Sequence, residues 1–150
     1  MKIIQQVANQ IRQLLLDNLI DPNRRRVERG NNWIFTDFPR ADATMPRIGI
    51  IFVDGSMERL AIGSPNQLQR GRLQVSIFLN KKGQYYINDE LEKSEYVLDY
   101  LANEIIKLVY NNQSSLRDEN VLHVLPINES FIEKDGIIQR NLDLEILIMR

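Results

Sequence analysis

Two segments of this 150-residue chain are apolar at every second position, and this pattern restricts the chain to a fold whose β-sheet buries one face. Asp143 and Glu145 occupy intervening positions in the later segment. The opposite register would place both carboxylates in the core at a prohibitive free-energy cost, so the pattern also determines which face is buried. The apolar series are Leu73, Val75, Ile77 and Leu79 in the first segment and Leu142, Leu144, Ile146 and Ile148 in the second.

Two other segments carry apolar residues at three- and four-residue steps, which predicts two amphipathic helices. The first covers about residues 3–20 and ends before Asp21-Pro22-Asn23, because proline disfavours helix in the residue that precedes it. The second is predicted over residues 89–110, with Asp89 and Glu92 as an acidic capping box at its start. The apolar stripes are Ile3, Ile4, Val7, Ile11, Leu14 and Leu15 in the first helix and Val97, Leu98, Leu101, Ile105, Leu108 and Val109 in the second.

The rest of the chain consists of short strand-like runs separated by polar stretches, which we expect to be loops, at 21–32, 54–72 and 80–88. The runs are 33–35, 48–53, 60–62, 121–125 and 127–132, and the last strand, 137–149, follows a turn at Lys134-Asp135-Gly136. We find no internal repeat or linker. These features predict one α+β domain over residues 1–150, in which a largely antiparallel or mixed sheet carries two amphipathic helices on one face.

The composition offers little for catalysis. The chain has no cysteine, which excludes disulfides, thiolate metal ligands and a cysteine nucleophile. His123 is the only histidine and lies in a strand-like run, and no G-x-S-x-G motif supports a serine triad. The seven glycines form neither a phosphate-binding loop nor a dinucleotide fingerprint. We therefore predict that the protein is not an enzyme and has no catalytic, cofactor-binding or metal-binding residues and no cofactor.

Three aspartates near the first strands suggest an alternative function. Asp37, Asp42 and Asp54 are able in principle to hold a magnesium ion for nuclease chemistry. The strand-borne acidic-x-lysine triplet that accompanies such acids in one large nuclease class does not occur in the chain. Turn and strand-end positions account for the three residues better.

A run of arginines is the one local feature that suggests a binding surface. Between residues 24 and 47 there are six arginines and three acidic residues, a balance that suits phosphates or an acidic protein surface. A solvated loop is the alternative interpretation. The whole chain has 19 basic and 20 acidic side chains, which argues against a dedicated nucleic-acid-binding protein. The candidate interface residues are Arg24, Arg25, Arg26, Arg29, Arg40 and Arg47.

The order of these elements resembles that of the tail terminator proteins (tail completion or tail-to-head joining proteins) of long-tailed phages and related viruses. The resemblance lies in the N-terminal helix, the apolar strand 45–53 that begins with a proline, the strand 73–79, the single following helix and the closing strand pair that contains residues 140–146. It covers most of the chain and involves no single diagnostic motif.

This resemblance implies a virion structural protein with an α+β fold and no catalytic residues. Members of the family form a ring, commonly a hexamer, that caps the tail tube, ends tail growth and docks to the head connector. The implied partners are further copies of the chain, the tail-tube protein and the head-connector or neck protein, with DNA passing through the ring without sequence-specific binding. The implied location is the tail-neck region of a virion made in the host cytoplasm.

Two other functions stay open at this point. One is a nucleic-acid-associated or nuclease-like domain that uses the loop Arg24–Arg29, and the other is a different neck or adaptor protein. The genes beside this one would separate these alternatives. A membrane partner is not expected, because no stretch approaches the roughly 18 apolar residues of a membrane span.

Overall fold

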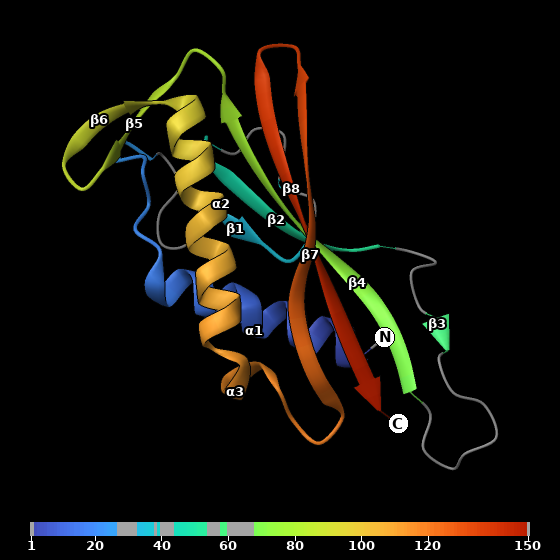
Figure 1. Ribbon diagram of the computed structural model, residues 1–150. Helices are drawn as coiled ribbons and strands as arrows, with labels where there is room; N and C mark the ends of the chain where they lie inside the picture. The colour runs from blue at the N-terminus through green and yellow to red at the C-terminus, as the bar shows by residue number, and fades with distance from the viewer. Residues whose placement is uncertain are drawn as a thin grey trace.

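A six-stranded sheet with helices on one face forms the body of the protein, as the computed structural model shows (Figure 1). The structure describes residues 2–26, 33–37, 39, 44–53, 58–59 and 68–149. In chain order the elements are α1 (Lys2–Asn18), β1 (Ile34–Phe35), β2 (Arg47–Phe52), β3 (Glu58–Arg59), β4 (Leu68–Asn80), β5 (Gln84–Ile87), β6 (Glu90–Lys93), α2 (Ser94–Asn111), α3 (Gln113–Leu116), β7 (Val121–Lys134) and β8 (Ile137–Met149).

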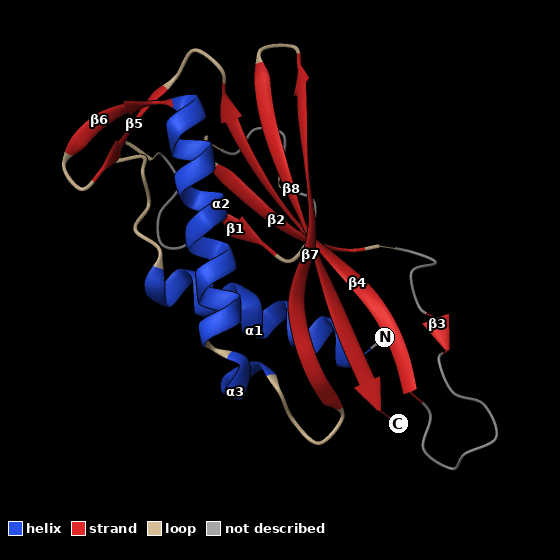
Figure 2. Cartoon of the chain, viewed as in Figure 1, coloured by secondary structure: helices blue, strands red, loops and turns tan. Residues whose placement is uncertain are grey.

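The main sheet has the strand order β1-β2-β4-β8-β7, and β3 pairs with one end of β4. Strand β1 runs parallel to β2, and every other pair in this sheet is antiparallel. Helices α1 and α2 lie together on one side of the sheet (Figure 2). The predicted α+β class, with a mostly antiparallel sheet and two helices on one face, is confirmed.

The predicted alternation determines which side of the sheet is buried. All eight residues of the two apolar series, on β4 and β8, are fully buried beneath the helices. Ile11 and Leu15 of α1 and Leu98, Leu101 and Ile105 of α2 fill the space above them and are equally inaccessible to water. Burial of these side chains drives folding because it removes apolar surface from water.

The start of the second helix was predicted wrongly. Residues 84–93 form the β5–β6 hairpin, and α2 begins at Ser94, five residues after the expected start at Asp89. Asn88 and Asp89 adopt φ values of 50° and 68°, the left-handed conformation that a two-residue hairpin turn requires and that Asn and Asp tolerate. The predicted capping box therefore does not exist, and the predicted loop 80–88 is reduced to the turn 81–83.

The closing hairpin agrees with its prediction. Asp135 and Gly136 form the turn between β7 and β8 with φ values of 53° and 75°, and Lys134 pairs with Ile137 on either side of them. Strand β7 continues through Pro126, where the pairing register shifts. The expected strand 60–62 lies outside the described residues. No helix among the described residues is long and apolar enough to cross a membrane.

We predict that Leu101→Ala lowers the free energy of unfolding by about 2–5 kcal/mol, because this fully buried side chain would leave a cavity under α2. Chemical denaturation of the two proteins measures the difference. Lys107→Ala is the matched control on the exposed side of the same helix and should change stability by less than about 0.5 kcal/mol. Equal losses in the two variants would contradict the helix orientation.

Candidate functional site

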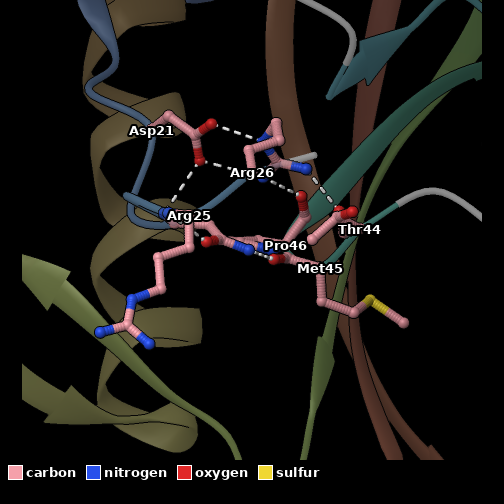
Figure 3. A network of polar contacts seen from close by, with 7 residues as sticks. Asp21, Arg25, Arg26, Thr44, Met45 and Pro46 are labelled. Carbon is pink, nitrogen blue, oxygen red and sulfur yellow. Dashed lines mark hydrogen bonds and ion pairs between the residues drawn. The ribbon is translucent and has the colours of Figure 1, made fainter. Parts of the chain in front are cut away.

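The segment that follows α1 is held to the sheet by Arg26 (Figure 3). Its Nε donates to Asp21 Oδ2 at 2.5 Å, and its Nη2 donates to Asp21 Oδ1 at 2.9 Å and to the carbonyl oxygen of Pro46 at 2.6 Å. Its Nη1 donates to the carbonyl oxygen of Thr44. The guanidinium also lies 5.5 Å from the centre of the Trp33 ring. The planar fork of arginine suits this combination of one carboxylate and two carbonyls.

Arg26 is therefore part of the framework and has little surface left for a partner. Only 5% of its side chain is exposed. Asn23 strengthens the same connection, because its Nδ2 donates to the carbonyl oxygen of Met45 at 2.6 Å and its Oδ1 accepts from the backbone N–H of Arg25 at 2.9 Å. The segment 21–26 is thus fixed relative to residues 44–46, which lead into β2.

Arg24 connects the same segment to the β5–β6 hairpin. Its guanidinium lies 4.2 Å from the centre of the Tyr86 ring and contacts the Asp89 carboxylate. The backbone N–H of Tyr86 donates to the carbonyl oxygen of Pro22 at 2.9 Å. The ion pair is largely exposed, so the backbone bond and the stacked ring contribute more to this junction than the charges do.

The remaining candidate arginines have separate surroundings. Arg25 is exposed, and its side chain has no hydrogen-bond or ion-pair partner among the described residues. Arg47 lies 5.7 Å from the centre of the Phe78 ring on the neighbouring strand. Arg29 and Arg40 lie outside the described residues. The interface role of the six arginines stays a prediction, and within the described part Arg25 is the most available of them.

His123 lies on the face of the sheet that the helices leave open. Its Nε2 is 3.0 Å from Glu145 Oε1, and the other carboxylate oxygen of Glu145 is 3.8 Å from Arg70 Nη1. The arrangement is a surface cluster that links three strands. Within the described ranges, no group of three or more His, Cys, Asp or Glu residues is close enough to hold a metal ion.

A row of polar side chains crosses this open face over β4, β8 and β7. Ser76 Oγ donates to Asn141 Oδ1 at 2.8 Å, and Asn141 Nδ2 donates to Ser130 Oγ at 3.3 Å. Gln74 Nε2 donates to Asp143 Oδ1 at 3.2 Å. Ser76 and Asn141 are buried, so their mutual bond satisfies groups that would otherwise be costly to remove from water.

The outer half of the β7–β8 hairpin is the most conspicuous apolar surface of the described chain. Residues 127–134 are all exposed, and the hairpin extends past the first turn of α2 (Figure 1). Ile127, Phe131 and Ile132 keep about half of their surface exposed, at 49%, 52% and 46%. We call residues 127–140 the ribbon. Sequence reasoning missed it as an exposed surface, although adjacent Phe131 and Ile132 point to opposite faces of one strand.

A basic surface lies on the other side of the first turn of α2. The β5–β6 hairpin, the turn 81–83 and residues 22–25 border two open cavities of about 300 and 350 Å³ that share Gln84. Pro22, Tyr86 and Leu91 add apolar lining. We call this surface the basic groove. Its charged lining residues are Arg24, Arg25, Lys81, Lys82 and Lys93, with Glu95 as the acidic member.

The ribbon and the basic groove meet at one ion pair. Lys81 Nζ contacts Glu133 Oε1, and this contact raises the pKa of Lys81 above its ordinary value, mainly through the hydrogen bond. On the other side of Glu95, Phe131, Arg140 and Leu98 border a further small cavity. The two surfaces are therefore continuous around the first turn of α2.

Comparison with known proteins finds likeness among solved structures. No protein-family model matches the chain, and no curated protein matches it. A solved structure described as the virion of a native gene transfer agent (GTA) particle contains a chain of similar fold, with a TM-score of 0.61 and 10% sequence identity. The likeness covers 97% of this chain and 94% of that chain. At this identity it shows that nearly the whole chain shares the fold of one protein of that virion.

We predict that Arg26→Ala lowers the free energy of unfolding by about 2–4 kcal/mol, because it leaves Asp21 and the carbonyls of Thr44 and Pro46 without their donor. Denaturant titration measures this loss. Arg25→Ala, one residue away and exposed, is the control and should stay within about 0.5 kcal/mol of the parent. Two equally stable variants would rule out the structural role of Arg26.

Proposed function

We propose that this protein is a virion structural protein that forms a ring at the end of a tail tube. The observation that supports it is the fold likeness over 97% of the chain to a protein of a virion particle. The order of the helices and strands, which resembles that of tail terminator proteins, leads to the more specific role: the ring ends tail growth and joins the tail to the head connector.

The surfaces of the molecule suit a ring subunit. A closed ring with cyclic symmetry needs two different complementary surfaces on each copy. The ribbon and the basic groove are two such surfaces, and they lie on different sides of the first turn of α2. The two surfaces are fixed relative to each other by the first turn of α2 and by the contact between Lys81 and Glu133.

The proposed partners are further copies of the chain, in a ring of six, the tail-tube protein and the head-connector protein. DNA would pass through the ring without sequence-specific binding, and the protein would be located in the tail-neck region of the virion. The loop Arg24–Arg29 would lie near a partner or the channel. In this part of the chain, Arg25 is the residue whose exposure best fits such a contact.

We expect the protein, mixed with its cognate tail-tube protein, to cap tube ends and stop tube growth. Electron microscopy of tube lengths measures this. Tubes of unlimited length with bare ends, in the presence of excess protein, would reject the terminator role. The single variant Arg25→Ala leaves Arg24 and Arg26 in place and so tests the exposed arginine without removing the two structural ones. Unchanged capping and head joining would assign Arg25 to a solvated segment.

We also propose that the protein has no catalytic activity on nucleic acids. Incubation with DNA and RNA in the presence of magnesium or manganese should leave both substrates intact, because the carboxylates considered for nuclease chemistry have no supporting lysine motif. Cleavage that disappears in Asp37→Ala or Asp54→Ala would overturn this expectation. Glu119→Ala, which changes an acidic residue outside these positions, is the control.

A further inference from the structure

We propose that the ribbon of one copy docks on the basic groove of the next copy, so that these two surfaces form the contact between neighbouring subunits. The inference rests on the proposed ring and goes beyond it by assigning the two halves of the contact. It commits to a second copy of this chain as the occupant of both surfaces.

The ribbon has the properties of a surface that is covered by protein. Phe131 and Ile132 expose large apolar side chains on its two faces, a combination that is costly in water when it persists uncovered. Strand β7 is also the last strand of the sheet in the described part of the chain, so one row of its backbone groups has no strand neighbour. Such an edge readily pairs with a further strand.

The charges of the two surfaces are complementary. The ribbon has three acidic and two basic residues, and within the same copy Glu129 pairs with Arg140 and Glu133 with Lys81, which leaves Asp135 as its acidic residue without an ion-pair partner in the described part of the chain. The basic groove has five basic lining residues and one acidic residue, Glu95. Within the described residues, Arg25, Lys82 and Lys93 have no ion-pair partner, so the groove keeps positive charge for an incoming acidic segment. Opposite potentials steer and orient such contacts.

The apolar parts of the two surfaces also match. Leu91 is 51% exposed and Tyr86 is 38% exposed, and both line the cavity that Arg24 and Arg25 border. This cavity can receive Phe131 or Ile132 while the acidic residues beside them face the lysines. An apolar anchor surrounded by charged residues is the usual arrangement of a specific protein interface.

The contact would be heterologous, because two different surfaces meet. Contacts of this kind generate closed rings when the rotation between neighbours returns to the start. Both surfaces lie at the end of the molecule where α2 begins, as the contact between Lys81 and Glu133 shows. Neighbours around a common axis need their two surfaces at the same height along that axis, which two surfaces at one end of the molecule allow.

Cysteine cross-linking tests the contact directly, since the native chain has no cysteine and gives no background. Ile132→Cys and Leu91→Cys each place one thiol on one surface. Treated with a short bismaleimide, a mixture of the two single variants should give a heterodimer, whereas each variant alone should stay monomeric. A chain that carries both substitutions should give a ladder that ends at the closed ring.

The matched control pairs Leu91→Cys with Ile20→Cys, because Ile20 is 81% exposed and lies outside both surfaces. Cross-linking no stronger than this control, both for the free protein at high concentration and with the tail-tube protein present, would overturn the proposal. Self-linking of Ile132→Cys alone would also overturn it, since that result indicates a two-fold contact between ribbons.

Charge reversal supplies an independent measurement. Lys82→Glu/Lys93→Glu should lower the heterodimer yield by about tenfold, and Lys107→Glu, on the exposed side of α2, should leave it unchanged. The outcome of the cross-linking experiment is independent of the outcome of the tube-capping assay. Capping without the cross-link leaves the ring function intact and rejects this contact, whereas the cross-link without capping supports the contact and rejects the terminator role.

Discussion

The pairing of β4 with β8, thirteen residues long, is the interaction on which the other parts of the structure depend. It aligns the two apolar series on one face, and α1 and α2 can bury their own apolar stripes only because that face exists. The short strands β1, β2 and β3 are positioned by β4, and β7 is positioned by β8. The exposed half of the β7–β8 hairpin is held in place by the buried half, so its apolar side chains stand outside the core without unfolding the strand.

A second level of organisation comes from arginine contacts with the chain that follows α1. Arg26 fastens residues 21–26 to residues 44–46, and Arg24 with Pro22 fastens the same segment to the β5–β6 hairpin. Together they connect the main sheet to the small two-stranded sheet. The arginines that form one charged run in the sequence therefore have different roles in the structure. Arg26 is a buried structural residue, and Arg25 is exposed.

The class of fold could be predicted from the sequence, because burial of one face of a sheet places an apolar residue at every second position of a strand. It predicted the start of α2 poorly because Asp89 and Glu92 suit both a capping box and a hairpin, and the burial of Tyr85 and Ile87 favours the hairpin. The role of Arg26 was beyond prediction, since two of its acceptors are backbone carbonyls about twenty residues away, and carbonyls carry no signature in sequence. The residues of the ribbon were predicted as strands. How far they project beyond the helices could not be predicted, because it depends on where α2 begins relative to the end of the sheet.

The polar row on the open face also discriminates between alternative alignments of the strands. Sliding β8 by one residue against β4 would turn its apolar side chains out of the core, which hydrophobic burial forbids. Sliding it by two residues would keep every apolar side chain inside, and burial alone would hardly oppose it. That slip breaks the Ser76–Asn141 and Gln74–Asp143 hydrogen bonds and places both β4 side chains opposite other polar residues of β8. The hydrogen bonds between these four side chains therefore favour the observed register of β8 against β4. That register also determines where the tip of the ribbon lies.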